Sequence, residues 1–256
     1  MAPVGSRSIR LFRNLAVRLR LLRIACGRRY VYHDLARLLP PAAPEISDLR
    51  GDINPFALAR EFPPSPGGLP DFAGIGPAAA FTRPELPPWN SEPGVAEFLG
   101  ELIIRRKMRL VVELGSFVGW TSAHLALALR HNGAGRLHCV ESVPDFIEVA
   151  RANLARLGLI DWVEFLAGES LDASILARLP AAVDLVFLDT THQYDATVKE
   201  IACYASRLTP QGCLVLHDSI RWGGVRRAVQ EAAAAFRVFT FATEQGNGLT
   251  VLLKRP

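Results

Sequence analysis

From residue 95 onward, stretches with helical periodicity alternate with short, almost continuous apolar runs. The short runs are rich in β-branched residues and too short for buried helices, which is typical of strands covered on both faces. The predicted strands are 109–114, 137–141, 162–166, 183–188 and 213–217. The predicted helices are 95–107, 122–130, 144–157, 171–179, 195–208 and 224–235.

The last part of the chain has a different pattern. Residues 236–242 and 249–254 are two further apolar runs with only a loop between them, which predicts an antiparallel pair. Strands that alternate with helices predict a parallel, doubly wound sheet. Residues 95–256 are therefore expected to form an α/β domain with a mostly parallel, seven-stranded sheet and an antiparallel C-terminal edge pair.

The first 94 residues differ from this domain in composition. Residues 1–50 hold ten arginines against three acids, and 13 of the 18 prolines fall between Pro40 and Pro93. We expect a basic helical extension over 1–38 and a proline-rich segment over 39–94. The second segment carries too many aromatic residues for a free linker, so it is either a substrate-side lid or a structural arm laid over the core.

Residues 9–24 have the pattern of a basic amphipathic helix, with leucines on one face and arginines over most of the remainder. Such a helix can dock on its own domain, on a second copy of the chain, or on an anionic membrane. We expect docking and a homo-oligomer, with peripheral membrane contact left open. Nucleic acid is disfavoured, because aromatic interleaving is missing and the rest of the chain is mildly acidic.

The four cysteines are widely spaced, which indicates neither a zinc site nor a disulfide framework. The arginines between residues 9 and 24 interrupt the apolar stretch there, so it resembles neither a signal peptide nor a membrane span. These features favour a cytoplasmic protein with reduced thiols.

Each of the five predicted parallel strands is followed by, or ends at, an acidic residue. In chain order these are Glu113, Glu141, Glu169, Asp189 and Asp218. Ligands of open α/β sheets bind at the carboxyl ends of the strands, so the acids predict a ligand site along one edge. A simple turn or cap role remains the alternative for any single acid.

The loop after the first strand contains Gly115, Ser116 and Gly119. Glycines let the backbone turn sharply and let a ligand approach the main chain at the start of the next helix. The GxxxG spacing differs from the GxGxxG of a dinucleotide site, and the loop lacks the ending of a phosphate-binding P-loop. An acid before the loop suits a cationic ligand, and Glu141 is placed to bind ribose hydroxyls. A nucleoside with a cationic tail is the predicted ligand.

The chain also resembles a known family. The motifs VVELGSFVGWTS, CVES, AGES, DLVFLDTTHQY and LTPQGCLVLHDS match in order and spacing those of class I S-adenosylmethionine (SAM)-dependent methyltransferases, over about residues 95–254. The last two motifs are similar to those of cephalosporin-hydroxylase-like proteins and metal-dependent O-methyltransferases of macrolide sugars. The resemblance implies a Rossmann-like methyltransferase fold, SAM as cofactor, and O-methylation of a small sugar-bearing or phenolic molecule.

The resemblance also implies roles for the loop residues. Glu113, Gly115 and Ser116 would surround the amino-acid end of the cofactor, Glu141 would bind its ribose, and Glu169 and Ser170 would lie beside the adenine. The predicted cofactor set also includes Gly119, Ser142 and Asp189.

For the reaction itself, the resemblance implies a general base at His192 and a magnesium site at Asp189 with two acids after the fifth strand. This chain has His217 and Asp218 there, so the predicted ligands are Asp189, His217 and Asp218. Magnesium prefers oxygen ligands, and a histidine weakens its site or favours softer ions, so the metal requirement stays open.

Structural roles remain the alternatives for three of these residues: His192 as a loop hydrogen-bonding residue, His217 as a core histidine, and Asp218 as a turn acid. The alternative functions are metal-independent methyl transfer to nitrogen or a carboxylate, and cofactor binding without catalysis.

Overall fold

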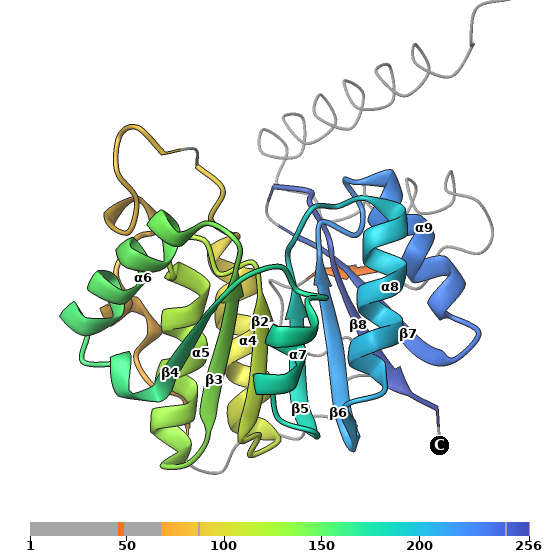
Figure 1. The fold of residues 1–256 in the computed structure, drawn as a ribbon, viewed down its shortest axis with the longest axis horizontal. Helices are drawn as coiled ribbons and strands as arrows, with labels where there is room; N and C mark the ends of the chain where they lie inside the picture. Colours follow the sequence, from red (N-terminus) through yellow and green to blue (C-terminus); the bar gives the residue numbers. More distant parts are fainter. Residues whose placement is uncertain (1–45, 49–67, 87, 244, 256) are drawn as a thin grey trace, which may run out of the picture. The chain divides into compact units, whose positions relative to one another are not determined.

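The computed structural model describes residues 46–48, 68–86, 88–243 and 245–255 (Figure 1). Contacts divide the chain into two compact units, Met1–Ile46 and Ser47–Pro256. The predictions for residues 1–38, including the basic helix at 9–24, lie outside the described residues, as does the proline-rich segment at 39–45 and 49–67. No helix within the described ranges is both long enough and apolar enough to span a membrane.

The second unit is built on a mixed β-sheet. A short strand, β1 (Ile46–Asp48), precedes the main strands, which are β2 (Leu110–Leu114), β3 (Arg136–Glu141), β4 (Val163–Ala167), β5 (Val183–Leu188), β6 (Leu208–His217), β7 (Phe236–Ala242) and β8 (Leu249–Lys254). The seven main strands lie in the order β7-β8-β6-β5-β2-β3-β4. Strands β4, β3, β2, β5 and β6 are parallel, whereas β8 is antiparallel to both β6 and β7. The predicted fold class is therefore confirmed.

The order of the strands creates a switch point. From β2 the chain moves outward through β3 to β4, then returns to the other side of β2 with β5. Leu114 and Leu188 are register partners at the ends of β2 and β5, and the amide of Asp189 donates to the carbonyl of Leu114 at 3.0 Å. Both loops therefore leave the sheet at one level, where open α/β sheets bind their ligands.

Helices cover both faces of the sheet. They are α4 (Pro93–Arg105), α5 (Trp120–Asn132), α6 (Pro144–Arg156), α7 (Ala173–Arg178), α8 (Tyr194–Ala205) and α9 (Gly223–Ala232), with short 3-10 turns η1 (Phe72–Ile75), η2 (Ala78–Ala80) and η3 (Ile160–Trp162). One apolar cluster joins α4, α5 and α6 to the sheet, and a second joins α7, α8 and α9 to the opposite face (Figure 1).

Strand β5 shows why the parallel strands read as continuous apolar runs. Leu185 and Phe187 pack in the first cluster, whereas Val186 and Leu188 pack in the second. Because alternate side chains of a strand face opposite sides, a stretch buried on both faces, such as residues 185–188, is apolar at every position, whereas Asp184 near the start of the strand is only partly buried.

Some predicted boundaries are wrong: the helix predicted over 224–235 ends at Ala232, and the junction of α8 and β6 differs most. Residues 195–208 were expected to be helical, but α8 ends at Ala205, and β6 begins at Leu208 rather than at residue 213. Leu208 pairs with Val183, and the register then shifts before Cys213 pairs with Leu185. The intervening bulge has polar residues and a glycine, so no apolar period marks it as strand.

The described end of the proline-rich segment packs on the domain. Phe72 and Phe81 are buried in the first apolar cluster, and the ring of Phe72 stacks on His124 with centroids 5.7 Å apart. Asn153 Nδ2 donates to the carbonyl of Phe81 at 2.8 Å. Residues 72–81 are thus an arm of the core, and within the described part of this segment the cavity is lined by Pro88, Trp89 and Asn90.

Candidate active site

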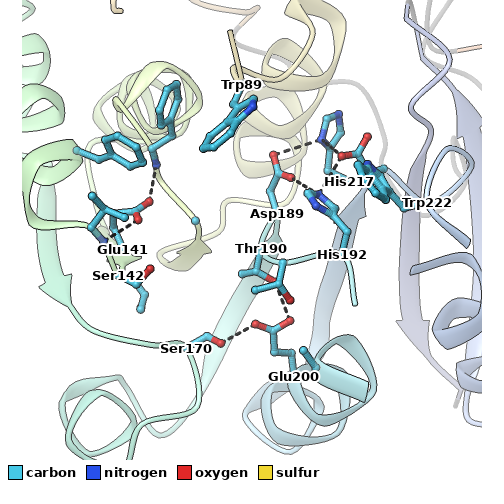
Figure 2. Close-up of a pocket in the computed structure, with 18 of the residues that line it drawn as sticks. Trp89, Glu141, Ser142, Ser170, Asp189, Thr190, His192, Glu200, His217 and Trp222 are labelled. Atoms are coloured by element: carbon cyan, nitrogen blue, oxygen red, sulfur yellow. Dashed lines mark hydrogen bonds and ion pairs between the residues drawn. The ribbon is translucent and has the colours of Figure 1, made fainter. Parts of the chain in front are cut away.

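A cavity of about 720 Å³ lies at the carboxyl ends of the parallel strands (Figure 2). This volume is within the usual range for small-molecule sites. Its walls come from the loops after β2 to β6 and from residues near 89 and 246. The predicted site residues that line it are Gly115, Glu141, Ser142, Glu169, Ser170, Asp189, His192, His217 and Asp218.

Glu113 does not line the cavity, although it was predicted to contact the cofactor. It is the penultimate residue of β2 and is fully buried, with its carboxylate directed toward α5. The hydroxyl of Ser122 donates to Glu113 Oε2, and Cys139 Sγ donates to the same atom at 3.2 Å. Burial raises the pKa of Glu113 to about 7. Its contacts join β2 to α5 and β3.

The glycines of the first loop serve close packing. Gly115 has φ +86°, and a Cβ there would lie 2.1 Å from the carbonyl oxygen of Asp189. Gly119, outside the cavity lining, has φ +82°, and a Cβ there would lie 2.9 Å from side-chain atoms of Ala150 and Leu154 on α6. Ser116 is outside the lining as well, and its buried hydroxyl has no hydrogen-bond partner among the described residues.

Glu141 is fixed by backbone amides at one end of the cavity. Its two carboxylate oxygens accept from the amides of Phe117 at 2.9 Å and Val143 at 3.0 Å. The Phe117 ring contacts Phe146 edge-on with centroids 4.7 Å apart, and Trp89 with centroids 5.9 Å apart. Glu141 therefore lies beside an aromatic wall (Figure 2).

Sequence reasoning missed Glu200, a cavity residue of α8 that is only 2% exposed. Ser170 Oγ and Thr190 Oγ1 donate to its two oxygens at 2.5 and 2.9 Å, which ties the loops after β4 and β5 together (Figure 2). Burial raises its pKa. Its position in the middle of a helix, away from the strand ends, gave no signal in the sequence.

His192 lies between two carboxylates at the opposite end of the cavity. Its Nε2 atom is 3.2 Å from Asp189 Oδ1 and 2.9 Å from Asp218 Oδ2 (Figure 2). Burial lowers the pKa of His192, but the two carboxylates outweigh this effect and raise it to about 9. The structure thus brings the predicted base together with both predicted acids.

The backbone at this cluster is strained. His192 and Asp218 have φ values of 60° and 59°, in the left-handed region that residues other than glycine seldom adopt. The Trp222 ring stacks on the His192 ring, with centroids 5.2 Å apart and an interplanar angle of 14°. Strain of this kind persists where the surroundings hold it, and it concentrates at functional sites.

His217 forms a buried ion pair that the sequence did not predict. Its Nε2 atom is 2.7 Å from Glu92 Oε2, and the two side chains are 5% and 0% exposed. Burial raises the pKa of Glu92, but His217 outweighs it and lowers this pKa to about 2. His217 Nδ1 is 3.2 Å from Asp189 Oδ2, although the two are not aligned for a hydrogen bond.

The group of side chains that could hold a metal ion contains Asp189, His192 and Asp218, each offering one ligand atom within 4.8 Å of the others. His217, which was predicted as a ligand, is not part of this group; its Nε2 atom is bound to Glu92. Asp218 Oδ1 is buried without a hydrogen-bond partner among the described residues, so it could accept a cation. Two carboxylates and an imidazole fit a borderline divalent ion better than magnesium.

A doubly wound sheet with an acid-lined cavity at its switch point has the architecture of α/β proteins that bind their ligands at the carboxyl ends of the strands. Residues 112–219 match the family model of the methyltransferase domain. The chain is 33% identical to the catechol O-methyltransferase of Mycobacterium tuberculosis over 158 residues, which cover 61% of this chain and 69% of that protein. The chain belongs to the class I SAM-dependent O-methyltransferases.

Other relatives agree with this assignment. The catechol O-methyltransferase of Niastella koreensis is 27% identical over 157 residues, 60% of this chain and 68% of that one. The O-methyltransferase TomG of Streptomyces achromogenes, solved in complex with SAM, is 25% identical with a TM-score of 0.61, covering 72% of this chain and 89% of that chain. The protein is a SAM-dependent enzyme that methylates oxygen.

Proposed function

We propose that this enzyme methylates a phenolic hydroxyl of a small aromatic molecule and that His192, Asp189 and Asp218 form its reaction centre. The observation that carries the proposal is the position of His192 Nε2, within 3.2 Å of both carboxylates at the cavity wall. Methyl transfer requires an acceptor oxygen held in line with the methyl group and a group that takes its proton.

The cofactor would occupy the end of the cavity that contains Glu141. A carboxylate has about four lone-pair sites, so Glu141 can bind ribose hydroxyls while it accepts two backbone amides. Glu169 and Ser170 would lie beside the adenine, next to the loop that Glu200 holds. Ser116, with its unpaired hydroxyl, would face the amino-acid end of the cofactor.

The acceptor would lie at the end that contains Trp222. This indole is 46% exposed and lines the cavity next to His192, so it offers an apolar surface to a flat ring. The two relatives named as catechol O-methyltransferases support a phenolic acceptor over a sugar hydroxyl.

We propose His192 as the base that takes the hydroxyl proton. Metal assistance is the second candidate, and the unpaired Asp218 Oδ1 favours it. Asp189, His192 and Asp218 would then hold a divalent ion, which supplies Lewis-acid polarisation of the acceptor when bound. An imidazole lone pair that binds a metal cannot take up a proton, so His192 has only one of these roles.

Calorimetric titration with SAM, followed by methylation of catechol with and without a chelator, tests the proposal. We expect SAM to bind and catechol to be methylated. Turnover that survives the chelator assigns His192 as the base, whereas turnover lost with the chelator and restored by Mn²⁺ or Mg²⁺ assigns it as a ligand. Absence of SAM binding would contradict the whole proposal.

A cytoplasmic location, a homo-oligomer and peripheral membrane contact through residues 9–24 stay predictions of the sequence. The last two depend on residues outside the described ranges.

A further inference from the structure

The cavity lining has a strongly uneven charge. Five carboxylates line it: Glu141, Glu169, Asp189, Glu200 and Asp218. Arg221 is the only arginine or lysine among the lining residues. Neither the cofactor site nor the reaction centre uses this side chain. His192 and His217 also line the cavity, but both are paired with carboxylates, so among the described lining residues Arg221 is the one cation whose charge could meet an anionic group of a ligand.

Arg221 is held in place by an uncharged partner. Its Nη1 atom donates to Asn247 Oδ1 at 3.0 Å, and its backbone amide donates to the Asn247 carbonyl at 2.9 Å. Asn247 itself is only 7% exposed, so this anchor is built into the domain. Within the described part of the chain, no carboxylate forms an ion pair with Arg221. Arg221 is itself exposed, so its positive charge is held at the cavity and is open to a ligand.

The position of Arg221 separates it from the cofactor. It follows β6, whereas the loop expected at the amino-acid end of SAM follows β2, two strands away or roughly 10 Å. Figure 2 shows Glu141 and Trp222 on opposite sides of the pocket, and Arg221 directly precedes Trp222 in the chain. Arg221 therefore belongs to the acceptor end.

The turn that carries Arg221 also carries the reaction centre. The amide of Trp222 donates to the carbonyl of Asp218 at 3.0 Å, so one turn presents Asp218, Arg221 and Trp222 together. A phenolic ring on Trp222 with its hydroxyl near His192 would have its substituents near this turn. Arginine binds carboxylates through paired, parallel hydrogen bonds.

We infer that the acceptor is a hydroxylated aromatic carboxylate whose carboxylate binds Arg221. This inference rests on the proposed function and narrows its substrate class. Arg221 is a specificity-determining residue: it lowers KM for acids and does not take part in methyl transfer.

Steady-state methylation of 3,4-dihydroxybenzoate and of its neutral amide, 3,4-dihydroxybenzamide, tests the inference. The variants are Arg221→Gln, Arg221→Lys and, as a matched control, Arg226→Gln on the exposed side of α9. We expect Arg221→Gln to raise KM for the acid about tenfold and to leave kcat for the acid unchanged. Both kcat and KM for the amide should stay as in the wild type. The KM of Arg221→Lys for the acid should lie between those of the wild type and Arg221→Gln. The kinetic constants of Arg226→Gln should match those of the wild type.

Three results for Arg221→Gln would overturn the inference and leave the proposed function standing. They are an equal change in KM for the acid and the amide, an unchanged KM for the acid, and weaker binding of SAM. Calorimetric titration of the enzyme with 3,4-dihydroxybenzoate, in the presence of S-adenosylhomocysteine, separates failure of the inference from failure of the proposed function. If neither compound is methylated but the acid binds in an Arg221-dependent way, Arg221 remains a carboxylate-binding residue, whereas the phenolic activity and the assignment of the acid as acceptor both fail. Absence of both methylation and acid binding overturns both.

Discussion

Glu92 Oε2 lies 2.7 Å from His217 Nε2 in a pair that joins the start of α4 to the end of β6, directly behind the reaction centre. Glu92 Oε1 also accepts from Thr243 Oγ1 at 2.6 Å, so the carboxylate ties the β7–β8 loop to the same point. A buried pair of this kind contributes little net stability as a whole, but loss of one partner leaves an uncompensated charge.

Glu92→Gln should therefore lower the free energy of unfolding by about 3–5 kcal/mol, measured by urea denaturation at pH 7. Glu148→Gln, on the exposed face of α6, is the control and should change it by less than about 0.5 kcal/mol. The double variant Glu92→Gln/His217→Gln should lose less unfolding free energy than the two single variants lose in total. Additive losses would argue against the ion pair.

His192→Asn should lower kcat by about 10²- to 10⁴-fold with an unchanged Kd for SAM, because the residue acts at the acceptor and not at the cofactor. His131→Asn, at the exposed end of α5, is the matched control. The pKa of His192 is raised to about 9, so the fraction able to take a proton, and kcat with it, should rise as the pH increases toward 9. Full turnover by His192→Asn would remove the residue from the mechanism.

Gly115→Ala should abolish SAM binding and destabilise the fold, because the new Cβ would lie 2.1 Å from the Asp189 carbonyl. Gly133→Ala separates this clash from backbone strain: Gly133 has φ +70° and nothing within 4 Å of its Cβ position. The free energy of unfolding should fall by only about 1–2 kcal/mol in Gly133→Ala. In Gly115→Ala it should fall by about 1–3 kcal/mol more. Equal losses would mean that the Asp189 contact is unimportant.

Glu113 should make stability depend on pH. Its pKa in the folded protein is about 7, above the ordinary value of 4.5, so the folded state binds this proton more tightly than the unfolded chain. Glu113 therefore adds about 3 kcal/mol to the free energy of unfolding. This contribution is complete below pH 4.5 and is lost as the pH rises through 7.

Denaturation midpoints across this range should fall with pH in the wild type, and the fall should be smaller in Glu113→Gln. Glu148→Gln serves again as the control and should follow the wild type. A Glu113→Gln profile parallel to that of the wild type would show that Glu113 titrates at its ordinary pKa.

Most of the fold could be predicted from the sequence, because a strand buried on both faces is apolar along nearly its whole length. Strand β5 was predicted at its observed limits of Val183–Leu188 for this reason. The start of β6 could not be predicted, because Leu208 enters the sheet by pairing with Val183 across a bulge that has no apolar period.

The acids at the strand ends were predictable for a related reason: parallel strands leave the sheet at one edge, so their ends meet. The sequence correctly predicted that Glu141, Asp189 and Asp218 share one cavity. It also predicted Glu113 at this site, but Glu113 does not line the cavity. Because side chains alternate along a strand, Glu113 points to the same face as Val111, toward α5, where Ser122 and Cys139 donate to it.

The sequence alone thus determined the sheet, its binding edge and the candidate acids, since these follow from periodicities of two and 3.6 residues and from chain order. Only the tertiary structure decided which groups touch. Glu92 and His217 are 125 residues apart in the chain, and Ser170 and Glu200 are 30 apart. No local pattern encodes such pairs, because their contact depends on how helices and loops from distant parts of the chain pack around the same strand ends.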